Sequence, residues 1–150
     1  MIRIAGLLKA YGATEVLHGL DLEVHPGEIF GYVGPNGAGK TTTMKILATV
    51  ESPSTGTVEV GGHDVAKDPF SVRRVIGFMP EMFGMYEELV VWEYLDFFAR
   101  VYELPVDRRE KLIDDVLALT DLGNKREAVI STLSRGVRQR LYLAKTILHD

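Results

Sequence analysis

The sequence contains no cysteine and no long uninterrupted apolar run, and each absence excludes a class of protein. Without cysteine the chain forms no disulfide framework and offers no thiolate to a metal, which agrees with a cytosolic setting. A membrane-spanning helix needs about 18 consecutive apolar residues, whereas Glu93, Asp96 and Arg100 interrupt the most apolar stretch, residues 89–102. No long apolar block follows Arg3 near the N-terminus, so a signal peptide is not expected.

The chain also lacks an excess of basic residues, which weighs against a broad nucleic-acid surface. Its 150 residues include 17 Lys and Arg against 21 Asp and Glu, a formal net charge of −4. Nucleic-acid binding relies instead on clustered basic side chains. Hydrophobic residues make up 46% of the chain, which is typical of one soluble α/β domain or of part of a larger one.

What the chain does contain is a glycine-rich motif of the form G-x-x-x-x-G-K-T, which is typical of a phosphate-binding loop. Its residues are Gly34, Pro35, Asn36, Gly37, Ala38, Gly39, Lys40, Thr41 and Thr42. The glycines let the backbone turn tightly and bring N–H groups against phosphate oxygens, where a β-carbon would intrude. The ammonium of Lys40 suits the β- and γ-phosphates of a nucleotide, and the hydroxyl of Thr41 suits a Mg²⁺ ion.

The segments that flank this motif match the context that such a loop requires. Residues 28–33 form an apolar run of strand type, and residues 42–48 place Met44, Leu47 and Ala48 at helical spacing. A strand, a glycine-rich turn and a helix N-terminus together make an anion site that carries about half a positive charge. A chance glycine-rich turn does not account for motif and context together.

Hydrophobic spacing and turn residues predict the remaining elements. Strands are expected at residues 2–5, 16–24, 57–60 and 74–79, with a turn at residues 9–12. Helices are expected at residues 69–74, from 91 to a break at 104–105, from an N-cap at Asp107 onwards, and after 136. The order of these elements predicts a β-rich layer before the phosphate-binding loop and a helical region after it.

Four separated features resemble the ATP-binding cassette (ABC) ATPases, in the order and approximate spacing of that family. They are Tyr11, the phosphate-binding loop, residues 76–81 (I-G-F-M-P-E) and residues 133–140 (L-S-R-G-V-R-Q-R). The resemblance covers the whole chain. It implies an α/β fold, a P-loop NTPase core with an N-terminal antiparallel β layer and an α-helical subdomain.

The resemblance also divides the chain into parts. Residues 1–80 are expected to form the β layer and the P-loop core, residues 81–140 a loop and the helical subdomain with the family signature, and residues 141–150 the start of a return to the core. The family continues with an apolar strand that closes on Asp-Glu, the Walker B strand, which these 150 residues lack. We therefore expect the front portion of a cassette, which binds ATP but hydrolyses it poorly, since a catalytic carboxylate typically contributes about 10²–10⁴-fold. The strand at residues 29–33 is expected to lack a parallel neighbour and to leave an exposed apolar edge.

Several site residues follow from the resemblance alone. Tyr11 is expected to stack on adenine and Val16 to contact the base, and stacking of a base on an aromatic ring is worth about 1–3 kcal/mol. Glu81 stands where most members carry glutamine, and its carboxylate can still meet Mg²⁺ and report the nucleotide state to a membrane partner. Lys40 and Glu81 are accordingly expected to act in catalysis, and Thr41 and Glu81 to hold Mg²⁺.

Residues 133–140 resemble the family signature, whose usual form is L-S-G-G-Q. Here Arg135 replaces the first glycine and Val137 the glutamine. Ser134 is a candidate N-cap, and Gly136 lets the backbone approach an anion at the positive end of the following helix. One nucleotide is not expected to need two such helix starts. The resemblance implies that Ser134 and Gly136 bind the γ-phosphate held by the P-loop of a second subunit.

The leading interpretation is the ATP-binding subunit of an ABC transporter, which couples ATP binding and hydrolysis to export through separate membrane subunits. Such a subunit lies at the cytoplasmic face of the cell membrane through its partners. One alternative is a soluble ABC protein that acts as a nucleotide-gated binding module, although the short helical region and net acidity are unfavourable. Another is a P-loop small-molecule kinase, in which the P-loop usually lies very near the N-terminus.

Overall fold

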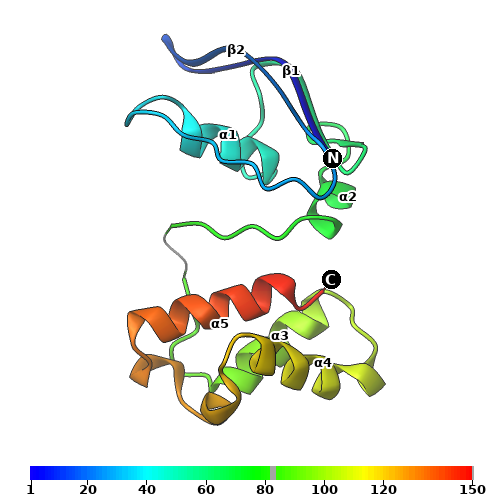
Figure 1. The fold of residues 1–150 in the computed structure, drawn as a ribbon, viewed down its shortest axis with the longest axis vertical. Helices are drawn as coiled ribbons and strands as arrows, with labels where there is room; N and C mark the ends of the chain where they lie inside the picture. The colour runs from blue at the N-terminus through cyan, green and yellow to red at the C-terminus, as the bar shows by residue number, and fades with distance from the viewer. Residues whose placement is uncertain (82–83, 150) are drawn as a thin grey trace. The chain divides into compact units, whose positions relative to one another are not determined.

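The structure is a computed structural model that describes residues 1–81 and 84–149. The chain divides into two units, Met1–Ile76 and Gly77–Asp150, and each buries an apolar core of its own. Figure 1 shows that all the strands belong to the first unit, whereas the three longest helices belong to the second.

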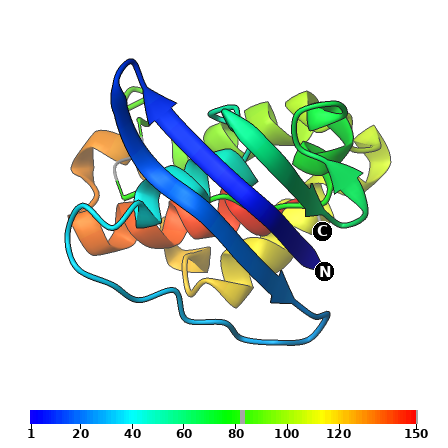
Figure 2. The same cartoon turned by 90° about the horizontal axis from the view of Figure 1, so that it is seen from above.

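Alternation of apolar and polar side chains gives the first unit its sheet. The strands are β1 (Ile2–Tyr11), β2 (Thr14–Val24), β3 (Thr55–Val60) and β4 (His63–Asp64). They lie in the order β2-β1-β3-β4 with antiparallel pairing throughout, and Figure 2 shows β1 and β2 as a long hairpin. Ile4 pairs with Leu22 on one side and with Val58 on the other, so these apolar side chains share the face toward the core. The predicted antiparallel layer is confirmed.

Two helices complete the first unit, α1 (Lys40–Leu47) and α2 (Pro69–Arg74). Helix α1 buries Ile46 and Leu47 in the cluster that the sheet builds. Helix α2 begins as predicted, because the Asp68 carboxylate accepts a hydrogen bond from the backbone N–H of Ser71 at 3.2 Å and a proline stands in its first turn.

The second unit consists of α3 (Val91–Val101), α4 (Val106–Leu119) and α5 (Arg135–Ile147), with 3₁₀ turns η1 (Gly123–Lys125) and η2 (Ile130–Thr132). The apolar faces of these helices form its core, in which Leu95, Leu117 and Leu141 are almost completely buried. Asp107 is not an N-cap: Pro105 takes that position, and Asp107 lies in the first turn, where its charge favours the helix start. Within the described residues no helix combines the length and the apolar character that crossing a bilayer needs.

Three strand and turn predictions are wrong. Residues 28–33 and 74–79 are not strands, because a strand needs hydrogen bonds from a neighbour and neither segment pairs with another described segment. Ile29 and Val33 are 103% and 90% exposed. The turn expected at residues 9–12 is shorter, because β1 continues to Tyr11 by pairing with the start of β2. The short strand β4 was not predicted.

Candidate functional site

The glycine-rich motif lies immediately before α1 and packs tightly against β2. Gly37 and Gly39 have φ values of 86° and 80°, which glycine adopts without strain. A β-carbon at Gly39 would lie 2.4 Å from Cδ2 of Leu17 and 3.2 Å from the carbonyl oxygen of Val16. Gly39 is also the N-cap residue of α1 and offers no side-chain acceptor to the first N–H groups of the helix. These groups therefore suit an external anion.

Lys40 places a cation directly over this loop. Its Nζ donates hydrogen bonds to the carbonyl oxygens of Gly34 and Pro35, both at 2.6 Å. The next residue, Thr41, is exposed at the helix start, whereas the hydroxyl of Thr43 donates to the carbonyl of Gly39 at 3.0 Å. Backbone N–H groups, one ammonium and one exposed hydroxyl fit a polyphosphate with a bound Mg²⁺.

Tyr11 and Val16 lie in the same unit as this loop. Tyr11 ends β1 with 47% of its surface exposed, and its phenol donates a hydrogen bond to the carboxylate of Glu51. This bond is the main cause of two pKa shifts: it raises the pKa of Tyr11 and lowers the pKa of Glu51. A hydrogen bond with Thr42 lowers the pKa of Tyr11 in turn. The phenol thus lies beside the start of α1.

The second unit holds the remaining predicted site residues. Ser134 is the N-cap of α5, as predicted, because its Oγ accepts a hydrogen bond from the backbone N–H of Val137 at 3.4 Å. A β-carbon at Gly136 would meet nothing within 4 Å, so the space over this helix start is open.

Glu81 lies in this second unit, beside the start of α5. It lines a cavity of about 330 Å³ together with Met79, Pro80, Arg135 and Gln139. Thr41, the other expected Mg²⁺ ligand, belongs to the first unit. Across residues 1–81 and 84–149, no group of three or more His, Asp or Glu side chains is placed to hold a metal ion by itself.

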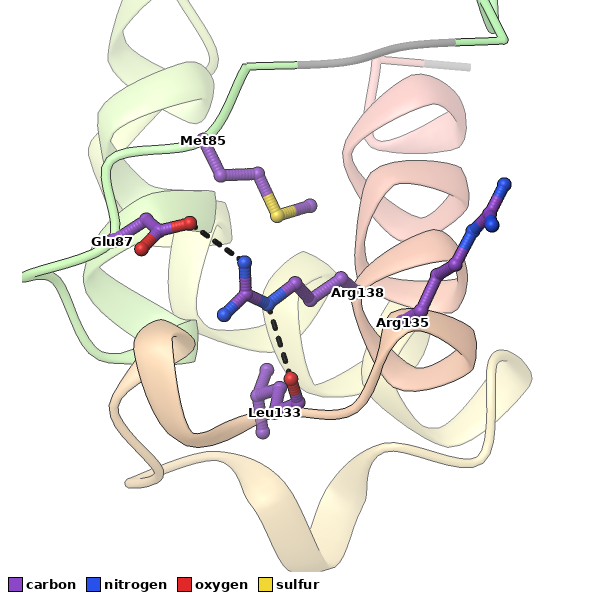
Figure 3. A pocket seen from close by; sticks show the side chains of 5 residues that line it. All are labelled: Met85, Glu87, Leu133, Arg135 and Arg138. Atoms are coloured by element: carbon purple, nitrogen blue, oxygen red, sulfur yellow. Dashed lines mark hydrogen bonds and ion pairs between the residues drawn. The ribbon is translucent and has the colours of Figure 1, made fainter.

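Sequence reasoning missed an arginine clamp in the second unit, which Figure 3 shows beside a cavity of about 360 Å³. Arg138 pairs with Glu87 at 2.7 Å, and its Nε and Nη2 donate to the carbonyls of Leu133 and Ser131 at 3.1 and 2.9 Å. The backbone N–H of Ser131 donates to the carbonyl of Glu87 at 3.0 Å. The clamp therefore ties the backbone and side chain of Glu87 to the turn before α5.

We expect Arg138→Ala to loosen the start of α5 and to lower the free energy of unfolding of the second unit by about 2 kcal/mol, because a partly exposed guanidinium loses three hydrogen bonds. Hydrogen exchange of the backbone amides in residues 133–138 measures this change. Arg140→Ala is the matched control, because Arg140 pairs with the fully exposed Asp121. Equal effects of the two substitutions would contradict the clamp.

Comparisons with known proteins point to one family. The family model for the ABC transporter matches residues 17–150. A daunorubicin resistance ATP-binding protein of Streptomyces coeruleorubidus is 37% identical over 149 residues, which are 99% of this chain and 47% of that protein. Nod factor export ATP-binding protein I of Ralstonia nicotianae is 33% identical over 150 residues, which are 100% of this chain and 47% of that protein.

Among solved structures, an ATP-binding subunit of an ABC transporter superposes with a TM-score of 0.87 at 28% sequence identity. The match covers 99% of this chain and 62% of that chain. The chain spans about half the length of the curated relatives it matches, with 47% of each covered.

Proposed function

Since this chain belongs to the ABC transporter family of ATP-binding proteins, we propose that it provides the nucleotide-binding surface of a subunit that couples ATP binding and hydrolysis to export. The observation that carries the proposal is the loop before α1, where the Lys40 ammonium lies on the carbonyls of Gly34 and Pro35. The names of two relatives, a resistance protein and an export protein, support export as the direction of transport.

In this proposal the first unit binds and orients the nucleotide. ATP with Mg²⁺ supplies the phosphoryl group and the metal charge that offsets its negative oxygens. The backbone N–H groups of residues 34–39 and the start of α1 hold the phosphates, and the Lys40 ammonium exchanges its two carbonyl partners for phosphate oxygens. The Thr41 hydroxyl holds Mg²⁺. The contribution of these residues is positioning and electrostatic stabilisation rather than covalent chemistry.

The base lies against Tyr11 and Val16 in this proposal. Tyr11 offers an exposed aromatic surface at the end of β1, and the Val16 backbone adjoins Gly39 of the loop. Stacking is tolerant of base identity because every base has a π-face, so discrimination between adenine and guanine nucleotides is expected to be modest.

The second unit is proposed to act on a nucleotide as well. Ser134 and Gly136 bind the γ-phosphate held by the P-loop of a second ABC ATPase subunit, and the open space over Gly136 supports this role. In Figure 3 the Arg135 side chain points away from the Glu87–Arg138 pair. Glu81 would offer its carboxylate to Mg²⁺ and would pass the nucleotide state on to membrane-spanning permease subunits. Those subunits hold the protein at the cytoplasmic face of the membrane.

Calorimetric titration of the purified protein with MgATP tests the nucleotide site. We expect saturable binding with a Kd below about 1 mM, and affinity that falls when EDTA removes Mg²⁺. A folded protein that does not bind MgATP at millimolar concentration would overturn the proposal. Co-elution of the full-length protein with a membrane-spanning partner in detergent tests its transport part, and recovery with ribosomes instead would overturn that part.

A further inference from the structure

We propose that Glu51 is a positioning residue that fixes the Tyr11 ring as a platform for the nucleotide base. This inference rests on the proposed function, because Tyr11 needs a fixed ring only if the first unit binds a nucleotide. It concerns a residue outside every motif that marks the site, in the segment that follows α1.

The Glu51 carboxylate joins three side chains from two elements. Its Oε2 accepts the hydrogen bond from the phenol of Tyr11 and lies 3.8 Å from Nζ of Lys9, which like Tyr11 belongs to β1. Its Oε1 accepts a hydrogen bond from Nζ of Lys45 on α1 at 3.2 Å. The Glu51 side chain is 20% exposed, so this is not an ordinary pair of solvated surface charges.

The backbone around Glu51 is held as firmly as its side chain. The N–H of Glu51 donates to the carbonyl of Lys45 at 3.2 Å. Three residues on, the N–H of Ser54 donates to the carbonyl of Leu8 at 3.0 Å, and the Oγ of Ser54 accepts from the N–H of Ala10 at 3.0 Å. Lys9 Nζ donates to the carbonyl of Ser52 at 2.7 Å. The segment that carries Glu51 is therefore fixed to α1 through the backbone of Glu51 itself and to the end of β1 through the residues that follow it.

The result is an aromatic ring with one occupied face and a large exposed area. Nζ of Lys9 lies 4.9 Å from the centroid of the Tyr11 ring, and 47% of the residue surface is exposed. Glu51 holds the hydroxyl end of the ring, and Lys9 lies over the ring itself. A ring held in this way presents its surface to a base without losing conformational entropy when the base binds.

If Glu51 positions the Tyr11 ring, its loss affects binding of the base and not binding of the phosphates. Two ligands distinguish these effects. MgATP carries both parts, whereas magnesium tripolyphosphate carries only the phosphates. We expect Glu51→Ala to weaken MgATP binding by about 3–10-fold, the effect of one lost hydrogen bond, and to leave the affinity for tripolyphosphate unchanged or slightly higher. A slight increase would reflect the removal of one negative charge near the phosphates.

Tyr11→Phe provides a second route, because it keeps the ring and removes only the hydroxyl that Glu51 binds. We expect the same loss of MgATP affinity as for Glu51→Ala, and no further loss when the two substitutions are combined. Glu59→Ala, which removes an exposed carboxylate from β3 of the same unit, is the matched control and should leave both affinities unchanged.

Three outcomes would overturn this role of Glu51: equal weakening of both ligands by Glu51→Ala, multiplicative losses in the double variant, or an unchanged affinity for MgATP. These outcomes are distinct from failure of the proposed function. If the unmodified protein binds neither MgATP nor magnesium tripolyphosphate, the nucleotide site itself is wrong. If it binds both and Glu51→Ala changes neither, only the role of Glu51 is wrong.

Discussion

Replacement of Lys40 with alanine is expected to weaken MgATP binding by about 100-fold or more. Lys40 supplies the cation that lies directly over the phosphate-binding loop, 2.6 Å from two of its carbonyl oxygens. Loss of an ammonium that makes charge-assisted hydrogen bonds to phosphate typically costs about 3 kcal/mol, which corresponds to this factor. The backbone N–H groups remain, so residual weak binding of phosphate is expected. Calorimetric titration with MgATP measures the loss.

A second substitution and a control make this result specific to the site. Lys40→Arg keeps the charge but brings a larger planar group into a loop built around a compact ammonium, and we expect about 10-fold weaker binding. Lys67→Ala removes an exposed lysine from the same unit, one that pairs with Asp64 at 3.0 Å, and binding should be unchanged. A Lys40→Ala protein that binds as tightly as the unmodified protein would show that the loop does not hold the phosphates.

Most elements that depend on neighbours in the sequence were predicted correctly. The phosphate-binding loop and α1 are local, because the glycines, Lys40 and the helical apolar spacing lie within about fifteen residues of each other. The N-cap at Ser134 is local for the same reason, since its hydroxyl accepts from an N–H three residues on. Asp107 was wrong because Pro105, two residues earlier, already takes the N-cap position of α4.

Features that depend on distant residues were not predictable in the same way. An apolar run such as residues 28–33 shows only that a segment favours burial, whereas a strand also needs a hydrogen-bonding neighbour. Glu87 and Arg138 are 51 positions apart, and Tyr11 and Glu51 are 40 apart. No spacing rule joins either pair. The residues proposed to bind phosphate therefore stand in a motif that the sequence displays, whereas the residues proposed to position the site do not.

The two helix starts at the proposed sites differ in a way that fits their proposed roles. The N-cap of helix α1 is a glycine with φ of 80°, which has no side chain to accept a hydrogen bond, so the first N–H groups of the helix stay available to an external anion. Helix α5 begins at Ser134, whose hydroxyl already accepts from the N–H of Val137. This difference supports the proposal that the start of α1 is the primary phosphate site and that the start of α5 acts on a phosphate already held elsewhere.

Gly56→Ala is expected to destabilise the first unit by about 3 kcal/mol or more, because the backbone of two strands meets at this glycine. Gly56 has φ of 89°, and a β-carbon there would lie 2.4 Å from the carbonyl oxygen of Gly6 and 2.8 Å from that of Ala5. These atoms belong to β1 and cannot rotate away as a side chain would. The β1–β3 register also shifts between Ala5 and Leu8, so an added methyl group would separate the strands where their pairing is already irregular.

Gly62→Ala isolates the part of this cost that comes from close packing. Gly62 has a similar φ of 85°, but a β-carbon there would meet nothing within 4 Å, so only backbone strain of about 1–2 kcal/mol is expected. Hydrogen exchange of the amides in β1 and β3 measures both variants, and the amides of α3 and α5 serve as an internal reference for the second unit. If the two alanine variants lose equal protection, close packing of β3 against β1 at Gly56 does not limit the stability of the sheet. The outcome bears on the site because Tyr11 and the phosphate-binding loop depend on this sheet.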